Sequence, residues 1–304
     1  MGLNYKMNHL IVKNEDSRRD IRNKKSDIKI AGVVILYNPE KDAYDNIMTY
    51  APYLDILYVL DNSSCSDTNV IKHIRTISNV KYIKHQCNIG ISKSLNEALS
   101  LAKKNYNWLL TMDQDTRFEV STFGDYLATL SDLPNLEKVY GFTPRYVGES
   151  DANIAYRLIE KGGCITSGNI INISIALACG GFDENLFIDS VDEEFCIRCG
   201  EHGFLLYEYT KKIMVQKIGN PYVLRIGGVR ICETSNHNYI RLYYITRNAF
   251  YVSTKYPQTK RYYYLLILKR IIKIVLLEPS KMRKLRFMVK GFMDFFNNKM
   301  GKME

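Results

Sequence analysis

The first 115 residues alternate short apolar runs with segments of helical spacing, and this alternation limits the fold more than any other feature. The apolar runs are rich in β-branched residues and predict strands at Ile28–Leu36, Ile56–Leu60, Val80–Lys84 and Trp108–Met112. Between them, helices are predicted at Asp42–Tyr53, Thr68–Ile77 and Ile91–Lys104. Strands that alternate with helices of this length form a mostly parallel sheet with helices on both faces. The predicted fold class is therefore α/β, with a Rossmann-like central sheet.

Polar residues follow the carboxyl end of each predicted strand. These clusters are Tyr37 and Asn38, Asp61 and Asn62, Asn88 to Gly90, and Asp113 to Asp115. In open α/β sheets the ligand binds outside the carboxyl ends of the strands. Four polar clusters at one edge of the sheet therefore predict a ligand site there.

Asp113 and Asp115 end the fourth predicted strand and are two residues apart. Alternate side chains of a strand point to the same face, so both carboxylates can point to one side. Hard oxygen ligands suit Mg²⁺ or Mn²⁺, which are typically shared with substrate phosphates. The pattern favours an enzyme that handles a nucleotide diphosphate, although a solvated turn gives the same residues.

Two of the other clusters also allow two interpretations. Asp61 and Asn62 can bind the edge of a pyrimidine base, or they can serve a turn or a helix start. Asn88 and Gly90 open a helix whose N-terminus can approach phosphates closely, or the helix is an ordinary one.

A second chemical centre lies at residues 189–194, where four carboxylates fall within six residues. A helix is predicted to begin here and to end near Gly200 or Gly203. Acidic residues stabilise a helix N-terminus, so a capped amphipathic helix is one interpretation. Four acids exceed what capping requires, which makes a catalytic carboxylate the alternative.

The motifs together resemble glycosyltransferase family 2 with the GT-A fold, and within it the bacterial rhamnosyltransferase branch. The resemblance runs from about Ile28 to about Tyr251. It is carried by VVILYNP (33–39), VLDNSS (59–64), NIGISKSLNEAL (88–99), WLLTMDQD (108–115), GGFDENLFIDSVDEEFCIRCGEHGF (180–204) and RLYYITRN (241–248).

The resemblance implies a role for each motif residue. Asp113 and Asp115 would hold the metal, and Asp192 would be the general base, with Glu193 and Glu194 as alternatives. The nucleotide would contact Tyr37, Asn38, Asp61, Asn62, Asn88, Gly90 and Asp113. The donor sugar or the acceptor would contact Gln114, Gly168, Asn169 and Arg247.

The resemblance also implies the reaction. It is an inverting transfer of L-rhamnose from dTDP-L-rhamnose to a growing, lipid-linked surface polysaccharide. Related enzymes use UDP-hexose donors such as UDP-galactose or UDP-N-acetylglucosamine, and this alternative stays open. A sugar nucleotidyltransferase is disfavoured, because the loop at residues 36–39 lacks the Gly-rich basic signature of that class.

One residue departs from the family pattern. Gln216 stands where related enzymes usually carry a His that assists metal or diphosphate binding, and Gln is a poor metal ligand. Either His237 substitutes for it, or Lys217 supplies charge, or fewer protein groups hold the metal. The departure gives weak support to a non-catalytic, membrane-associated scaffold.

The basic character of the chain belongs to its C-terminal part. Residues 237–304 contain fifteen Lys or Arg and three acids, whereas the whole chain has a formal net charge of +10. Aromatic, apolar and cationic residues interleave from Tyr262 to Leu277, which suits a membrane surface. The alternative is a helical cap with a solvated basic face. No nucleic-acid motif is recognised in this region.

Composition sets the expected compartment and domains. Seven Cys, an odd number in a chain of 304 residues, disfavour a disulfide framework. Residues 1–27 are polar and lack the apolar core of a secretory signal. We expect a polar extension at 1–27, a GT-A catalytic domain at 28–235 and a helical region at 236–304. The expected location is the cytoplasm, peripherally on the inner face of the cell membrane.

Overall fold

The computed structural model describes residues 28–65, 68–119, 122–146, 150–151, 154–160, 163–216, 222–226 and 229–304. They form two compact units. The sheet unit comprises the described parts of 28–89, 93–182 and 195–216, and the helical unit comprises 90–92, 183–194 and the described part of 217–304. The predicted extension at 1–27 lies outside the described residues. The predicted boundary at residue 235 stays a prediction.

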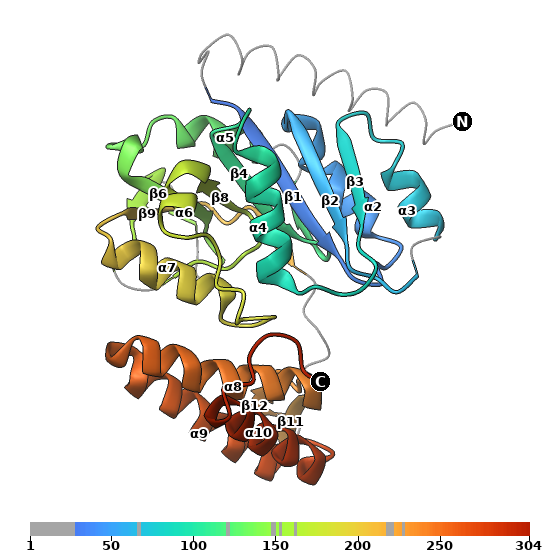
Figure 1. Cartoon of the computed structure of the whole chain (residues 1–304), viewed down its shortest axis with the longest axis vertical. Coiled ribbons are helices and arrows are strands. Elements are labelled where there is room, and N and C mark those ends of the chain that lie inside the picture. The colour runs from blue at the N-terminus through green and yellow to red at the C-terminus, as the bar shows by residue number, and fades with distance from the viewer. Residues whose placement is uncertain are drawn as a thin grey trace. The chain divides into compact units, whose positions relative to one another are not determined.

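An eight-stranded sheet organises the sheet unit, in the order β3-β2-β1-β4-β8-β6-β9-β7 (Figure 1). Its strands are β1 (Ile30–Leu36), β2 (Ile56–Asp61), β3 (Val80–Lys84), β4 (Trp108–Asp113), β6 (Val139–Pro144), β7 (Tyr156–Leu158), β8 (Asn169–Asn172) and β9 (Leu205–Tyr209). Strands β1 to β4 pair in parallel, as do β6 and β9, whereas β8 runs antiparallel to β4 and β6. The predicted mostly parallel sheet is confirmed.

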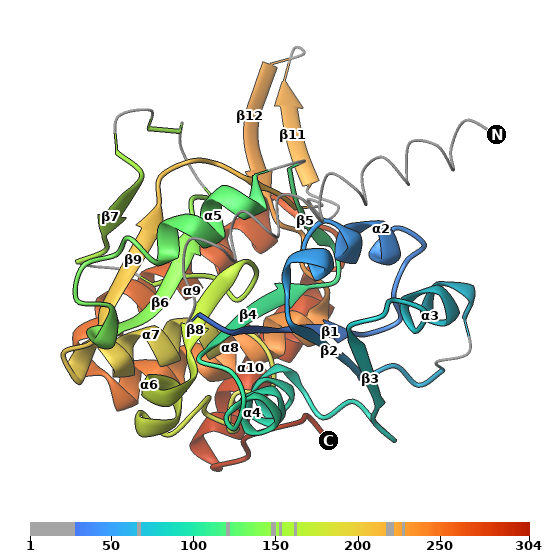
Figure 2. The same cartoon turned by 90° about the horizontal axis from the view of Figure 1, so that it is seen from above.

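Helices cover both faces of this sheet. Figure 2 shows α2 and α5 on one face and α4 and α6 on the other. The helices are α2 (Ala43–Met48), α3 (Asn69–Ile74), α4 (Ile91–Ala102), α5 (Phe123–Leu130), α6 (Ile173–Ala178) and α7 (Val191–Glu201). Short 3-10 helices span Ala51–Tyr53 and Leu136–Lys138, and β5 (Thr116–Phe118) pairs with β10 (Met214–Gln216).

Strand β1 explains why the apolar runs show no polar alternation. Ile30, Val34 and Leu36 join one hydrophobic cluster, which also contains Tyr50 and Phe123. The intervening residues at 31, 33 and 35 point to the opposite face and are also buried. A strand covered on both faces reads as a continuous apolar run.

Two predicted elements were wrong in extent. The apolar run from Ile170 to Ala178 suggests one strand, but β8 ends at Asn172 and α6 begins at Ile173. The Asn172 side chain accepts a hydrogen bond from the Ile175 amide and so caps the new helix. The helix predicted at Asp42–Tyr53 ends at Met48, and a 3-10 turn that contains Pro52 follows.

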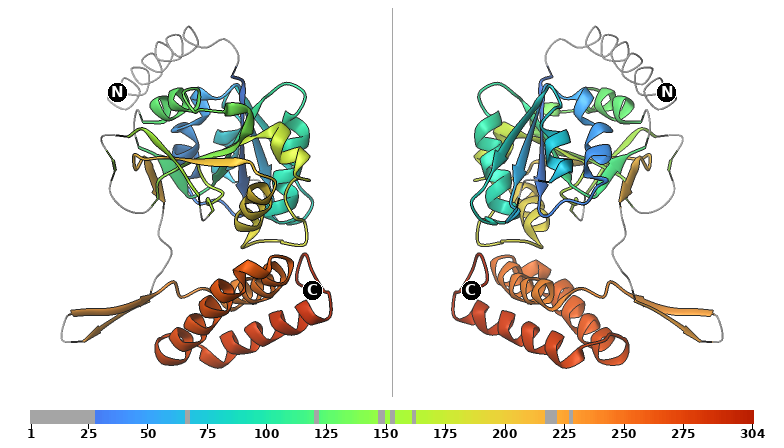
Figure 3. Two further views of the ribbon diagram at one scale, coloured as in Figure 1. Left: turned by 90° about the vertical axis from the view of Figure 1, so that its left-hand side faces the viewer. Right: turned by 90° about the vertical axis from the view of Figure 1, so that its right-hand side faces the viewer.

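The helical unit contains the predicted C-terminal helices. They are α8 (Tyr239–Lys255), α9 (Lys260–Leu277) and α10 (Lys281–Phe296), with a 3-10 turn at Pro257–Thr259 (Figure 3). Strands β11 (Tyr222–Ile226) and β12 (Val229–Thr234) form a separate antiparallel hairpin. Helices α8 and α10 pack closely, since a Cβ on Gly291 would lie 2.4 Å from the Tyr243 carbonyl oxygen. Within the described residues, no helix is both long and apolar enough to cross a membrane.

Candidate active site

The carboxyl ends of three neighbouring strands bring the predicted site residues of the sheet unit together. In the register of β1, Leu36 pairs with Asp61 of β2, and Ile35 pairs with Asp113 of β4. The two carboxylates therefore flank the end of β1 from either side. The chain leaves β1 through Tyr37 and Asn38 at the same edge. This is the edge at which α/β sheets bind ligands.

Hydrogen bonds tie the loops at this edge to one another. The Tyr37 amide donates to Gln114 Oε1 (2.9 Å), and Gln114 Nε2 donates to the Tyr37 carbonyl (3.1 Å). The Asn38 amide donates to Ser63 Oγ (2.7 Å), and Asn38 has a φ of 48°. Tyr37 itself is 53% exposed. The backbone of this loop is thus fixed, while the Tyr37 ring faces solvent.

Asn62 lies beneath this edge at the centre of a buried polar network. Its Oδ1 lies 2.8 Å from His85 Nδ1, and its Nδ2 donates to Ser94 Oγ (3.1 Å). His85 Nε2 lies 2.7 Å from Glu97 Oε2. These contacts fix the orientation of the Asn62 amide. Sequence reasoning missed His85, Ser94 and Glu97, since no spacing signal connects them to Asn62.

Asp61 is fully buried next to this network. Its Oδ1 accepts from the Ser63 amide (2.9 Å), and its Oδ2 accepts from the Tyr82 hydroxyl (2.5 Å). Through these bonds Asp61 fixes the loop after β2 and ties it to β3. The neighbouring Asn62 is also buried, at 2% exposed.

The two predicted metal ligands stand on different elements. Asp113 is the last residue of β4 and is half-buried, whereas Asp115 is exposed in the turn before β5. Because β4 ends at Asp113, strand alternation does not set the direction of the Asp115 side chain, and the metal site of the two carboxylates stays a prediction. The Asp113 amide donates to Ser167 Oγ (3.0 Å), and Asp115 Oδ1 accepts from the Thr116 hydroxyl (3.2 Å).

The donor set at this turn is limited. Among the described residues, no group of three or more His, Cys, Asp or Glu is placed to hold a metal ion. Mg²⁺ is usually bound by one or two carboxylates together with substrate phosphates and water. Asp113 and Asp115 fit that kind of site, in which the substrate completes the coordination.

Gly168 and Asn169 are both buried, and their predicted contact with the donor sugar or the acceptor stays a prediction. The Gly168 amide donates to the Thr111 carbonyl (2.7 Å), and its φ of +79° favours glycine. Asn169 is 2% exposed, and its side-chain Nδ2 donates to Cys164 Sγ (2.9 Å). Asn169 is the first residue of β8 and pairs with Thr111 of β4, whereas Gly168 lies in the turn before β8.

The acidic segment at the start of α7 is held by the C-terminal helices of the helical unit. Glu194 is fully buried and accepts from Lys255 Nζ (2.8 Å) and from the Tyr256 hydroxyl (2.7 Å). Glu193 accepts from the Tyr263 hydroxyl (2.7 Å). The Asp192 side chain is half-buried and accepts from the Glu193 amide (3.1 Å). The two alternative bases therefore have structural partners on α8, on α9 and in the turn between them.

The residues just before α7 adopt an unusual backbone conformation. Asp189 and Ser190 have φ values of 64° and 60°. Asn248 Nδ2 donates to the carbonyls of Ile188 and Asp189 (both 2.8 Å), and Arg241 donates to Asp189 Oδ1 (3.0 Å). Burial raises the pKa of Asp189, although Arg241 partly offsets this shift. Left-handed non-glycine residues are strained and cluster at functional sites.

A comparison with known protein families matches the part of the chain that forms this sheet edge. Residues 36–182 match the family model of glycosyl transferase family 2. The chain carries a glycosyltransferase family 2 domain. The match contains every predicted site residue of the sheet unit, whereas Asp192 and Arg247 lie beyond its end.

One sequence relative and one solved structure are also similar to this chain. A protein named dTDP-rhamnosyl transferase RfbF, from Shigella flexneri, is 27% identical over 247 residues, which cover 74% of this chain and 80% of the relative. The crystal structure of S. aureus TarS matches with a TM-score of 0.51 and 14% identity, over 88% of this chain and 44% of TarS. This chain thus spans less than half of TarS, and that likeness shows the GT-A fold.

The structure also describes the surroundings of three further predicted residues, Arg247, Gly90 and Asn88. Arg247 is fully buried, and its guanidinium donates to the Lys299 carbonyl (3.1 Å) and the Gly301 carbonyl (2.6 Å). A Cβ on Gly90 would lie 2.6 Å from the Phe187 ring. Asn88 is half-buried in the loop after β3. Gln216 ends β10, but its side chain and Lys217 lie outside the described residues.

Proposed function

We propose that this glycosyltransferase moves L-rhamnose from dTDP-L-rhamnose to a hydroxyl of a growing, lipid-linked surface polysaccharide. The name of the Shigella flexneri relative supports rhamnose as the sugar, at modest identity. Because a lipid-linked acceptor is held in the membrane, the proposed location of the enzyme is peripheral, on the inner face of the cell membrane. The acceptor belongs to the O-antigen or capsule class of polysaccharides.

One observation carries the proposal: the polar ends of β1, β2 and β4 meet at one sheet edge inside the family 2 match. The exposed Tyr37 ring offers a flat surface for the nucleobase, and Asn38 lies beside it. Asp61 and Asn62 support this surface through the loop after β2. Asn88 and Gly90 follow β3, and we assign them to the phosphates of the donor. Gln114 holds Tyr37 in place.

We assign the divalent ion to Asp113 and Asp115. Bound there, Mg²⁺ or Mn²⁺ neutralises the diphosphate that leaves with the nucleotide. The two carboxylates bind the ion, and the β4–β5 turn sets their positions. This assignment includes no protein ligand from Gln216.

We assign the general base to Asp192. Its carboxylate takes the proton from the acceptor hydroxyl as that oxygen attacks the anomeric carbon. Attack from the face opposite the leaving diphosphate inverts the configuration in a single displacement. The choice of Asp192 rests on the family resemblance of its segment. Glu193 and Glu194, the alternatives, hold the segment through Tyr263, Lys255 and Tyr256. Asn169 and Arg247 are assigned structural roles because both are buried.

Two other functions remain testable. A UDP-hexose donor would keep the fold and the mechanism but change the sugar. A non-catalytic scaffold would keep the fold alone, and the Gln216 departure favours it weakly.

A donor screen separates the three functions. Thermal shift and donor hydrolysis are measured with and without Mn²⁺, for dTDP-L-rhamnose, UDP-galactose, UDP-glucose and UDP-N-acetylglucosamine. Metal-dependent stabilisation by dTDP-L-rhamnose alone supports the proposal, and preference for a UDP-sugar replaces the donor. No response to any nucleotide, with or without metal, supports the scaffold.

A further inference from the structure

Helix α9 has two apolar faces, of which the protein covers one. Tyr263, Ile267 and Ile274 are buried. The other apolar face consists of side chains that are each between 43% and 67% exposed: Tyr264, Leu265, Leu268, Ile272, Val275 and Leu276. Their spacing of three and four residues places them along one stripe. A contiguous exposed apolar patch of this kind marks an interaction or membrane site.

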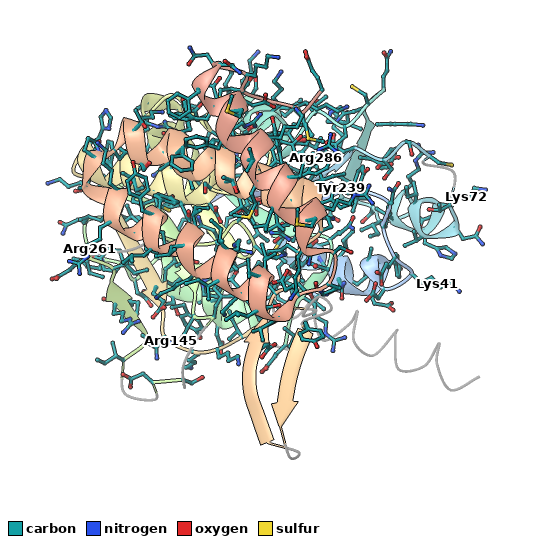
Figure 4. All side chains as sticks on the ribbon, turned by 90° about the horizontal axis from the view of Figure 1, so that it is seen from below. Lys41, Lys72, Arg145, Tyr239, Arg261 and Arg286 are labelled. Carbon is teal, nitrogen blue, oxygen red and sulfur yellow. The ribbon has the colours of Figure 1, made fainter. Side chains whose placement is uncertain are left out.

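Helix α10 repeats this arrangement. Its buried side contains Lys284, Met288 and Gly291. The opposite side carries an apolar stripe of side chains that are between 51% and 81% exposed: Met282, Val289, Met293 and Phe296. Arg286 occupies the position in this stripe between Met282 and Val289. Figure 4 looks onto α9 and α10 and labels one cation on each, Arg261 and Arg286.

On these two helices most cationic side chains are exposed, whereas the acidic side chains are buried. Eight cationic side chains are exposed: Lys260, Arg261, Lys269, Lys273, Lys281, Arg283, Arg286 and Lys290. The only acids between residues 260 and 296 are Glu278 and Asp294, and both are buried. Glu278 accepts from Lys284 Nζ (2.6 Å), and Asp294 accepts from Lys290 Nζ (2.7 Å). The exposed surface of α9 and α10 therefore carries positive charge alone.

We infer that the exposed stripes of α9 and α10 dock on an anionic lipid bilayer. Aliphatic residues enter the boundary between headgroups and acyl chains, while the flanking lysines and arginines bind anionic headgroups. The inference deepens the proposed function and rests on it for one link, namely that a lipid-linked acceptor is reached at this surface.

The same chemistry disfavours two other occupants. A second copy would bring eight exposed cations against eight more, and like charges repel. A nucleic acid would use the cations but would gain little from the stripes, because bases stack on aromatic rings and only Tyr264 and Phe296 of the ten stripe side chains are aromatic.

The test is sedimentation of the full chain with vesicles, without donor or acceptor. Phosphatidylcholine vesicles are compared with vesicles that also contain phosphatidylglycerol. Binding to the anionic vesicles alone, weakened by salt, is the expected result. Leu268→Asp and Val289→Asp should each weaken binding roughly tenfold, and the double charge reversal Lys281→Glu with Arg286→Glu should weaken it at least as much.

Matched controls come from the sheet unit. Leu177 of α6 is also exposed (41%), and Lys103 and Lys104 are exposed after α4. Leu177→Asp, and Lys103→Glu with Lys104→Glu, should leave vesicle binding unchanged. An unchanged melting temperature and unchanged donor hydrolysis show that each stripe variant is folded.

Several results would overturn the inference. These are equal binding to neutral vesicles, binding that the stripe variants leave intact, or loss of binding in the Leu177 control. Concentration-dependent dimerisation abolished by Val289→Asp, without vesicle binding, would assign the stripes to a second copy. Because donor hydrolysis is measured separately, its failure would count against the proposed function and not against the docking surface.

Discussion

Gln114 and Tyr37 hold each other through two hydrogen bonds, one in each direction between the Gln side-chain amide and the Tyr backbone. The pair links the loop after β1 to the turn that carries Asp113 and Asp115. It fixes the exposed Tyr37 ring relative to the proposed metal ligands. Sequence reasoning expected Gln114 to contact the donor sugar or the acceptor, but its amide has these backbone partners.

Gln114→Ala should therefore weaken donor binding more than turnover. The two lost hydrogen bonds contribute about 1 kcal/mol each, so the donor KM should rise about thirtyfold while kcat changes little. Gln114→Glu should have a smaller effect, because it keeps an acceptor for the Tyr37 amide and loses only the donor to the Tyr37 carbonyl. Asn105→Ala, an exposed amide after α4, is the control. An unchanged KM in Gln114→Ala would remove the positioning role.

The strands β1, β2 and β4 were predictable because they are buried at almost every position. Runs such as Ile30–Leu36 are apolar at every position, which distinguishes them from amphipathic helices. The end of β8 was not predictable from apolarity, since Ile173–Ala178 is as apolar as the strand before it. Only the capping side chain of Asn172 marks the change, and a single Asn is a weak local signal.

The partners of the acidic segment were beyond sequence reasoning for another reason. Glu194 and Lys255 are 61 residues apart, and Glu193 and Tyr263 are 70 residues apart. Periodicity describes one element at a time, and it contains no information on which helix a given carboxylate will meet. The sequence indicated that the segment has more acidic residues than helix capping requires. It could not indicate which of them form hydrogen bonds with side chains far away in the sequence.

Asp192→Asn should abolish turnover and leave the donor bound. Removal of a general base typically costs a factor of about 10² to 10⁴ in kcat. Donor affinity, measured by isothermal titration with Mn²⁺ present, should stay within about twofold of wild type, because the substitution keeps the side-chain shape. Glu193→Gln is the matched control and should retain most of kcat. Equal loss in both variants would move the base assignment away from Asp192.

Lys255→Met should destabilise the helical unit. Glu194 would keep Tyr256 but lose its ammonium partner while it remains buried. Removal of one partner from a buried ion pair costs about 3 kcal/mol, and the partial exposure of Lys255 reduces this to about 2 kcal/mol. Adding Glu194→Gln should recover only part of the loss, because it removes the buried Glu194 charge while Asp183 still lacks its bond to Lys255. Urea unfolding of the two single variants and the double variant measures the coupling.

Asp183 should make stability fall in acid. Burial would raise the pKa of its carboxyl, but hydrogen bonds from Lys255 and Tyr251 outweigh burial and lower the pKa. The folded protein therefore binds this proton less readily than the unfolded chain. The stabilisation is present above about pH 4 and is lost as the pH falls through the lowered pKa.

Asp183→Asn removes this titration. Between about pH 6 and about pH 3, wild type should lose more unfolding free energy than the variant, because the other acids titrate in both proteins. The measurement is the urea midpoint at each pH. Parallel losses in the two proteins would show that Asp183 does not contribute.

Two helical glycines give opposite predictions for the same substitution. A Cβ on Gly291 of α10 would lie 2.4 Å from the Tyr243 carbonyl oxygen, a backbone atom that moves only with α8. Gly291→Ala should therefore separate the two helices and cost about 1 to 3 kcal/mol, as overpacking does. A Cβ on Gly200 of α7 meets nothing within 4 Å. Gly200→Ala should stabilise the protein by about 0.5 to 1 kcal/mol, since alanine loses less backbone entropy in a helix. Thermal melts of both variants decide the matter, and the close packing of α8 against α10 would be contradicted if Gly291→Ala melted at or above the wild-type temperature.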